Sequence, residues 1–343
     1  MLQKSIRVRK AFCLGSVIWL AFSSWAQYGG QSSYEFLNIP NNARLAALGG
    51  VNTSLADHDI NFFFSNPALA GDSLAGWASA SYLAYVGNIG QASFAYAAPF
   101  KRIGTVLFGV QHISYGEIEG FDATGAPAGT FQSGETALVI GMSHHLGSFR
   151  MGANVKAVFS NLAGFRSSAV MVDLGGVFIH PEHDFTVGLV IRNVGFVLSE
   201  YSETSDTEIP FDVQAGLTYK PEHMPLRFSV SVYNLVRPGE LYDDPADQET
   251  EGTLDKVLGH FNFGAEVLLH RNVHLLAGYN FLRQKELRVE TGGGGSGFNF
   301  GFSVNVRSFD FTFATSRYSV GNSNYTFTLA TNLERMIFKK RTL

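Results

Sequence analysis

The stretch Gly297-Phe-Asn-Phe-Gly-Phe-Ser-Val-Asn-Val306 decides the fold, because every second residue in it is apolar. Its three phenylalanines and two valines would share one face of an extended chain, while glycine, asparagine and serine share the other. About ten residues of strict alternation are what a tilted strand needs to cross a bilayer. The stretch therefore predicts a membrane-spanning strand with one apolar and one polar face.

The same alternation, followed along the chain, predicts fourteen strands. They cover roughly residues 76–87, 90–100, 103–116, 135–147, 149–163, 167–180, 185–198, 210–220, 226–236, 257–270, 273–289, 297–306, 309–319 and 324–333. An even number is typical of bacterial outer-membrane barrels built from a single chain. We therefore expect an all-β fold, a 14-stranded antiparallel transmembrane β-barrel, which must be closed because unpaired strand edges are too costly in hydrocarbon.

The lengths of the connections support this interpretation and suggest an orientation. Each even-numbered connection is a short turn, and the long ones, 117–134, 199–209, 237–256 and 290–296, are all odd-numbered. Outer-membrane barrels have short periplasmic turns and longer external loops. The pattern predicts that both termini are periplasmic and that the long loops lie at the cell surface.

Composition and the N-terminus favour an exported membrane protein. Of 343 residues, 45% are hydrophobic and only 16% are charged. Residues 1–26 read as a signal peptide, with a basic start, an apolar run over 11–22 and the cleavage pattern Ser24-Trp25-Ala26. Its removal leaves 21 basic and 29 acidic residues and no cysteine. A net charge of −8 argues against a nucleic-acid partner, and the missing thiols exclude disulfides and cysteine chemistry.

Residues 27–75 form the one long part of the mature chain that does not alternate, and we expect them to form an N-terminal, partly helical plug segment of a barrel spanning 76–333. Good helix formers at 43–48 predict one or two helical turns that Gly49-Gly50 would end. Asn66 and Pro67 have the residue types of a helix N-cap and first helical position. Residues 334–343 form a basic C-terminal tail.

A plug is expected because the lumen-facing residues of the clearest strands are small, which leaves space. Arg44, Asp57 and Asp59 are the candidates for charge-assisted hydrogen bonds between the plug and a small, polar lumen wall. In this interpretation the segment enters the barrel from the periplasmic side. The alternative is a periplasmic tether packed on the barrel mouth.

Two strings in this segment resemble a known family. Leu37-Asn-Ile-Pro-Asn-Asn-Ala-Arg-Leu-Ala-Ala-Leu-Gly-Gly-Val51 is similar to the N-terminal signature of the PorQ family of type IX secretion proteins. The residues from Asp57 to Leu69, with their Asn-Pro-Ala element, are similar to its continuation, and to PorV proteins and the long-chain fatty-acid transporters. The resemblance implies a fourteen-stranded barrel with an N-terminal plug.

The functional implication of the resemblance is a non-enzymatic barrel without a cofactor. It would anchor a PorZ-like surface protein, alongside PorU-like and PorV-like proteins, in the complex that processes secreted cargo and attaches it to lipopolysaccharide. The alternative is an outer-membrane transporter of hydrophobic molecules. The chain shows no catalytic spacing, and His144-His145, adjacent on a strand, would face opposite sides and cannot share a metal.

Two long acidic loops are the candidates for partner binding, because rigid barrels carry function on their loops. Their acidic residues include Glu200, Glu203 and Asp206 in one loop and Glu240, Asp243, Asp244 and Asp247 in the other. The second loop lacks the glycine and glutamate spacing of an EF-hand, so we predict no calcium site. A merely solvated acidic surface is the plain alternative.

The phenylalanine rows allow two orientations. Turned inward, Phe298, Phe300 and Phe302 would line a hydrophobic channel. That orientation would place Asn299, Ser303 and Asn305 against lipid, at a cost of several kcal/mol. We therefore predict that the phenylalanines face lipid.

Overall fold

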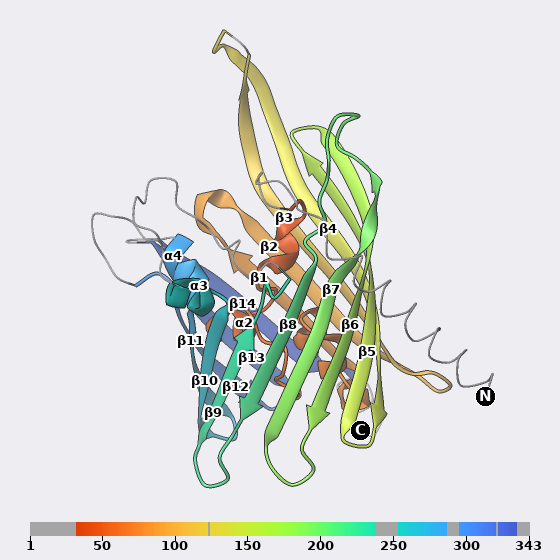
Figure 1. The fold of residues 1–343 in the computed structure, drawn as a ribbon, viewed down its shortest axis with the longest axis vertical. Coiled ribbons are helices and arrows are strands. Elements are labelled where there is room, and N and C mark those ends of the chain that lie inside the picture. The colour runs from red at the N-terminus through yellow and green to blue at the C-terminus, as the bar shows by residue number, and fades with distance from the viewer. Residues whose placement is uncertain (1–31, 123, 237–252, 287–294, 320–321, 335–343) are drawn as a thin grey trace, which may run out of the picture. The chain divides into compact units, whose positions relative to one another are not determined.

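Fourteen antiparallel strands close into a barrel in the computed structural model, which describes residues 32–122, 124–236, 253–286, 295–319 and 322–334 (Figure 1). The strands are β1 (Trp77–Ala84), β2 (Gly90–Phe100), β3 (Gly104–Phe121), β4 (Pro127–Leu146), β5 (Phe149–Leu162), β6 (Phe165–Ile179), β7 (Phe185–Ser199), β8 (Asp212–Tyr219), β9 (Leu226–Val232), β10 (Phe261–His270), β11 (Val273–Asn280), β12 (Phe298–Val306), β13 (Phe309–Ser319) and β14 (Asn322–Asn332). Each strand pairs with the next, and β14 pairs with β1. The predicted fold class is confirmed.

Several predicted boundaries were wrong. The expected loop over 117–134 is mostly strand, because β3 and β4 continue as a paired hairpin as far as Phe121 opposite Pro127 (Figure 1). Strand β10 begins four residues later than predicted, since Thr253–Gly259 forms the helix α3. Strand β11 ends at Asn280, where helix α4 (Phe281–Glu286) begins. Alternation alone does not separate a strand end from an amphipathic helical turn.

The outer face of the wall is apolar, as predicted. Phe300 is 54% exposed, whereas its neighbour Asn299 is 1% exposed and faces the lumen. The same alternation appears in other strands, where exposed Phe94 and Phe327 each lie between two buried small residues. A closed barrel with this surface suits a lipid bilayer. None of the helices formed by the described residues is both long and apolar enough to span a membrane.

The lumen is filled by residues 33–75, which form short helical turns. These are η1 (Glu35–Asn38), α2 (Ala43–Ala47), η2 (Ile60–Phe64), η3 (Pro67–Leu69) and η4 (Asp72–Leu74). Nearly all of this segment is buried, and its side chains form four apolar clusters, each of which includes residues of the barrel wall. We call residues 33–75 the plug.

The plug crosses the lumen from one end of the barrel to the other. We call the end that carries the β7–β8, β9–β10 and β11–β12 connections the long-loop end, and the opposite end the short-turn end. The backbone N–H of Ser33 donates to the carbonyl of Glu208 at the long-loop end, at 2.8 Å. Residues 71–76 lead into β1 at the short-turn end. The expected entry of the plug from the short-turn side is therefore not what the described residues show.

Candidate functional site

A cluster of five charged side chains joins the plug to the wall. Arg44 on α2 donates from Nε to Glu266 Oε1 at 2.8 Å and from Nη2 to Asp57 Oδ2 at 2.9 Å. Arg227 Nη1 lies 2.8 Å from Asp57 Oδ2 and 2.7 Å from Glu266 Oε2. Arg44 Nη1 lies 3.8 Å from Asp59 Oδ2. Two guanidinium groups thus link two plug carboxylates to one wall carboxylate.

The strand register explains why the two wall residues meet there. Glu266 on β10 lies directly opposite Arg227 on β9, and both occupy lumen-facing positions. The side chain of Glu266 is only 2% exposed, so an unpaired charge at this position would be costly. Arg44 supplies the additional positive charge from the plug, and its guanidinium also lies over the ring of Phe62, 5.7 Å from the centroid.

The two plug carboxylates differ in their electrostatics. Burial works against ionisation of Asp57, but Arg44 and Arg227 outweigh it and lower the pKa of its carboxyl well below the usual range. Burial raises the pKa of Asp59, and the more distant Arg44 only partly offsets that effect. Asp59 also has a structural role, since Oδ1 accepts from the backbone N–H of Asn61 at 3.0 Å and so caps η2.

Asn66 and Pro67 lie at the start of η3. Asn66 Oδ1 accepts from the backbone N–H of Ala68 at 3.0 Å, and Pro67 occupies the first turn. The Asn66 side chain also donates to the carbonyl of Thr53 at 2.9 Å, which ties two parts of the plug together. Asn66 therefore caps a helical turn of the plug and Pro67 begins it, as their residue types predicted.

Glycines in the wall let the plug backbone come close, a feature that the sequence analysis missed. A Cβ at Gly278 on β11 would lie 2.3 Å from the backbone of Leu48 and Gly49, and one at Gly188 on β7 would lie 2.0 Å from the carbonyl oxygen of Thr53. The signal for these contacts is an isolated glycine inside a strand, which often marks close backbone approach. Glu266 and Arg227 were also missed, although charged residues at lumen-facing strand positions were visible in the alternation.

The lumen is not uniformly small and polar, contrary to our expectation. Toward the long-loop end, strands β3 to β6 turn apolar side chains inward, and these enclose the start of the plug. The residues of this apolar chamber are Ile113, Ala137, Val158, Ala169 and Met171 from the wall, with Tyr34, Phe36 and Leu37 from the plug. Phe36 is 1% exposed and Met171 is fully buried.

Polar contacts hold the plug's first turn in this apolar chamber. The hydroxyl groups of Tyr34 and Ser167 hydrogen-bond, and Arg192 Nη2 donates to the carbonyl of Leu37 at 2.9 Å. The ring of Tyr34 stacks on Tyr201 with centroids 6.4 Å apart. Tyr34 has a φ of 62°, a left-handed conformation that a bulky side chain seldom adopts.

A second buried ion pair lies in the wall itself. Lys156 Nζ is 2.7 Å from Asp173 Oδ2, with side chains 2% and 0% exposed. Lys156 Nζ also donates to Asn193 Oδ1 at 2.8 Å. The β6–β7 register shifts between Val172 and Leu174, and the backbone N–H of Asn193 donates to Asp173 Oδ1 instead of to a strand carbonyl. Side chains thus replace backbone pairing at this bulge.

The acidic loop residues are only partly described. Glu200, Glu203 and Asp206 are exposed in the β7–β8 connection at the long-loop end. Glu240, Asp243, Asp244 and Asp247 lie outside the described residues, as do the expected signal peptide and most of the C-terminal tail. Within the described part of the chain, no three His, Cys, Asp or Glu side chains come together in a way that would hold a metal ion.

These features define a closed, plugged, fourteen-stranded barrel with an apolar exterior. No protein-family model and no curated protein matches the chain. Among solved structures, it is similar to a deletion mutant of the TodX monoaromatic hydrocarbon channel, with a TM-score of 0.53 and 12% identity over 85% of this chain and 98% of that one.

Two further similarities are weaker. The CymD monoaromatic hydrocarbon channel gives a TM-score of 0.47 at 13% identity, covering 85% of this chain and 97% of that chain. A Pseudomonas aeruginosa FadL homologue gives 0.44 at 10% identity, covering 85% and 98%. At 12% identity, the similarity to TodX concerns the fold, which is shared over 85% of this chain.

Proposed function

We propose that this protein is an outer-membrane barrel that passes small hydrophobic molecules inward from its long-loop end, without catalysis. The apolar chamber is the observation that carries this proposal. The fold shared with the TodX monoaromatic hydrocarbon channel supports it, as does an exterior suited to lipid. In this proposal the long-loop end faces the cell surface, as the connection lengths predict.

The apolar chamber suits a small hydrophobic molecule because the ring of Phe36, itself a hydrophobic group, is already buried in it. Burying a phenylalanine side chain completely contributes about 1.5–3 kcal/mol. A monoaromatic molecule that took the place of the Phe36 ring would gain burial of the same order. The polar contacts that hold the plug's first turn include the Tyr34–Ser167 and Arg192–Leu37 hydrogen bonds. Displacement of the plug's first turn would open the apolar chamber toward the long-loop end.

The test is uptake of labelled toluene by cells that lack other channels for it and express this barrel. F36A leaves a ring-sized space in the chamber, and we expect it to raise both uptake and the affinity of the purified barrel for toluene several-fold. F63A removes an equally buried plug phenylalanine from a different apolar cluster and serves as the control. Uptake that equals that of cells without the barrel, for the wild type and F36A alike, would overturn the proposal.

A second candidate function is the one that the sequence resemblance implies, an anchor for a PorZ-like surface protein in a type IX secretion complex with PorU-like and PorV-like proteins. It is supported by the strings over 37–51 and 57–69 and by exposed Glu200, Glu203 and Asp206, which lie at the same end as the extended β3–β4 hairpin. The structure gives those strings another explanation, since Arg44, Asn66 and Pro67 hold the plug together. Affinity purification from detergent-solubilised outer membrane distinguishes the two functions: an anchor retains a surface protein stoichiometrically, and a channel does not.

A further inference from the structure

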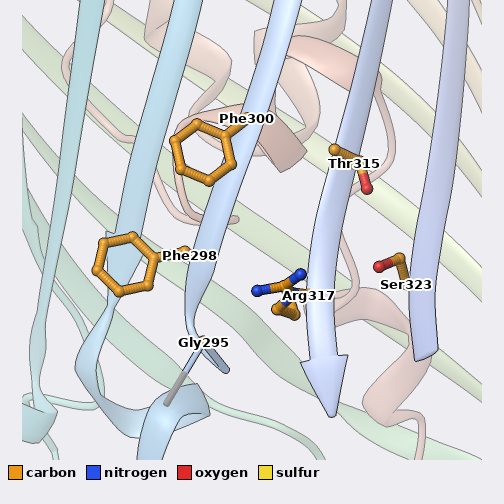
Figure 2. A pocket seen from close by; sticks show the side chains of 6 residues that line it. All are labelled: Gly295, Phe298, Phe300, Thr315, Arg317 and Ser323. Atoms are coloured by element: carbon orange, nitrogen blue, oxygen red, sulfur yellow. The ribbon is translucent and has the colours of Figure 1, made fainter. Parts of the chain in front are cut away.

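The outer wall of the barrel has a cleft that is lined in part by the positively charged side chain of Arg317. It has a volume of about 380 Å³ and lies near the long-loop ends of three adjacent strands. Figure 2 shows Phe298 and Phe300 on β12, Thr315 and Arg317 on β13, and Ser323 on β14, with Gly295 just before β12. We call this the Arg317 cleft.

The residues of the Arg317 cleft face the membrane side, not the lumen. Phe298 and Phe300 are 47% and 54% exposed, whereas Asn299 between them is buried in the lumen. Thr315 and Arg317 continue the outward row of β13, and the lumen-facing Ser316 between them is buried. The register pairs Thr315 with Phe300 and Arg317 with Ser323, so the cleft is a continuous patch across the three strands.

The position of Arg317 corresponds to the edge of the apolar band. Going up β13, the outward residues change from three phenylalanines at 309, 311 and 313 to Thr315 and then Arg317. Lipid headgroups begin at such a boundary. In the described parts of the chain, no carboxylate forms an ion pair with Arg317. The Arg317 side chain is exposed, so an anion from outside the protein can reach it.

Several neighbouring groups lie beside the Arg317 side chain. Gly295 packs against the Arg317 side chain so closely that a Cβ there would lie 2.8 Å from Cδ and 2.9 Å from Nη1. A glycine at this point lets the guanidinium stay beside the wall. The hydroxyl groups of Thr315 and Ser323 add two hydrogen-bonding groups on the same face, and Phe298 and Phe300 add an apolar surface directly beside the cation.

From this combination we propose that the Arg317 cleft binds a phosphorylated lipid of the leaflet at the long-loop end. The phosphate would accept charge-assisted hydrogen bonds from Arg317, whose planar guanidinium suits phosphate oxygens, and hydroxyl hydrogen bonds from Ser323 or Thr315. The acyl chains would lie along Phe300 and the phenylalanines below it. This inference is independent of transport through the lumen.

The test is native mass spectrometry of the detergent-solubilised full-length barrel with three probes: dimyristoyl phosphatidic acid, the diacylglycerol with the same chains, and inorganic phosphate. We expect phosphatidic acid to bind, the diacylglycerol to bind at least about tenfold more weakly, and inorganic phosphate not to displace it. R317Q should weaken phosphatidic acid binding about tenfold or more, since hydrogen bonds to charged groups contribute on that order. R317K should keep part of the affinity.

R102Q, which removes a cation from an exposed turn at the short-turn end, is the matched control and should bind phosphatidic acid as the wild type does. Unfolding midpoints of all variants establish that they are folded. The proposal is overturned if folded R317Q binds phosphatidic acid as tightly as the wild type, which would mean that Arg317 merely reaches toward water. Equal binding of the diacylglycerol, or displacement by inorganic phosphate alone, would overturn it as well.

Discussion

Arg44 of the plug and Glu266 of β10 form a two-point contact, with Nε 2.8 Å from Oε1 and Nη2 3.2 Å from Oε2. The Arg44 and Glu266 side chains are 11% and 2% exposed, so this contact between plug and wall is largely shielded from water. A buried ion pair contributes little over an apolar pair of the same shape, but breaking it from one side is costly. The pair therefore fixes where the plug lies more than how stable the barrel is.

R44M should destabilise the plug by about 3–5 kcal/mol, because it leaves two carboxylates to Arg227 alone. R44M combined with E266L should recover much of that loss, since it removes the uncompensated charge as well. Urea unfolding of the wild type, both single variants and the double variant gives the coupling energy. Strictly additive effects would show that the contact has no energetic role.

Replacing Gly278 by alanine should displace the plug near Leu48 and Gly49, because the new methyl group has no space. Overpacking of this kind typically costs about 1–3 kcal/mol. Gly176 on β6 is the matched control, since a Cβ there meets nothing within 4 Å. The comparison of unfolding midpoints and of protease sensitivity of the plug tests this, and G278A behaving like G176A would contradict the close approach.

Acid should weaken the attachment of the plug. Because Arg44 and Arg227 hold the pKa of Asp57 below its usual range, the stability that this carboxylate contributes is present above about pH 4 and is lost as the pH falls further. The pKa of Asp59 is raised, so ionisation of this carboxyl lowers the stability of the folded state as the pH rises above about 4.

Unfolding midpoints measured between about pH 2.5 and 6 check this prediction. D57N should lower stability at pH 6 and should flatten the loss at the acid end. D57N with the same acid dependence as the wild type would assign that dependence to other groups.

For the buried Lys156–Asp173 ion pair, removing one partner should destabilise the barrel more than removing both. Among the described residues, K156M leaves the buried Asp173 carboxylate with hydrogen bonds from Asn193 and Asn154 and no ion-pair partner, so we expect a loss of about 3–5 kcal/mol. K156M combined with D173L should be less destabilised than K156M alone. Thermal unfolding followed by gel mobility distinguishes these variants, and equal midpoints for K156M and the wild type would contradict the predicted cost.

The sequence predicted most of the barrel and much less of the lumen. Alternation in strands such as Phe298–Val306 follows from a wall with lipid on one side, so strand number and the outward phenylalanines could be predicted. Which lumen residues meet could not, because Glu266 and Arg44 are separated by 222 residues along the chain. The apolar chamber does not follow from the C-terminal strands, whose inward residues are small, because its Ile113 and Met171 lie on β3 and β6.

The plug's course through the lumen has a consequence for the order of assembly. Residues 33–75 precede every strand in the chain, yet the wall around them closes only when Trp77 of β1 pairs with Asn332 of β14. The first-made segment is thus enclosed by the last-made strand. Since a closed barrel would have to admit a chain through its full length, folding is simplest if the strands assemble around the plug, which then acts as a template for the curvature of the wall.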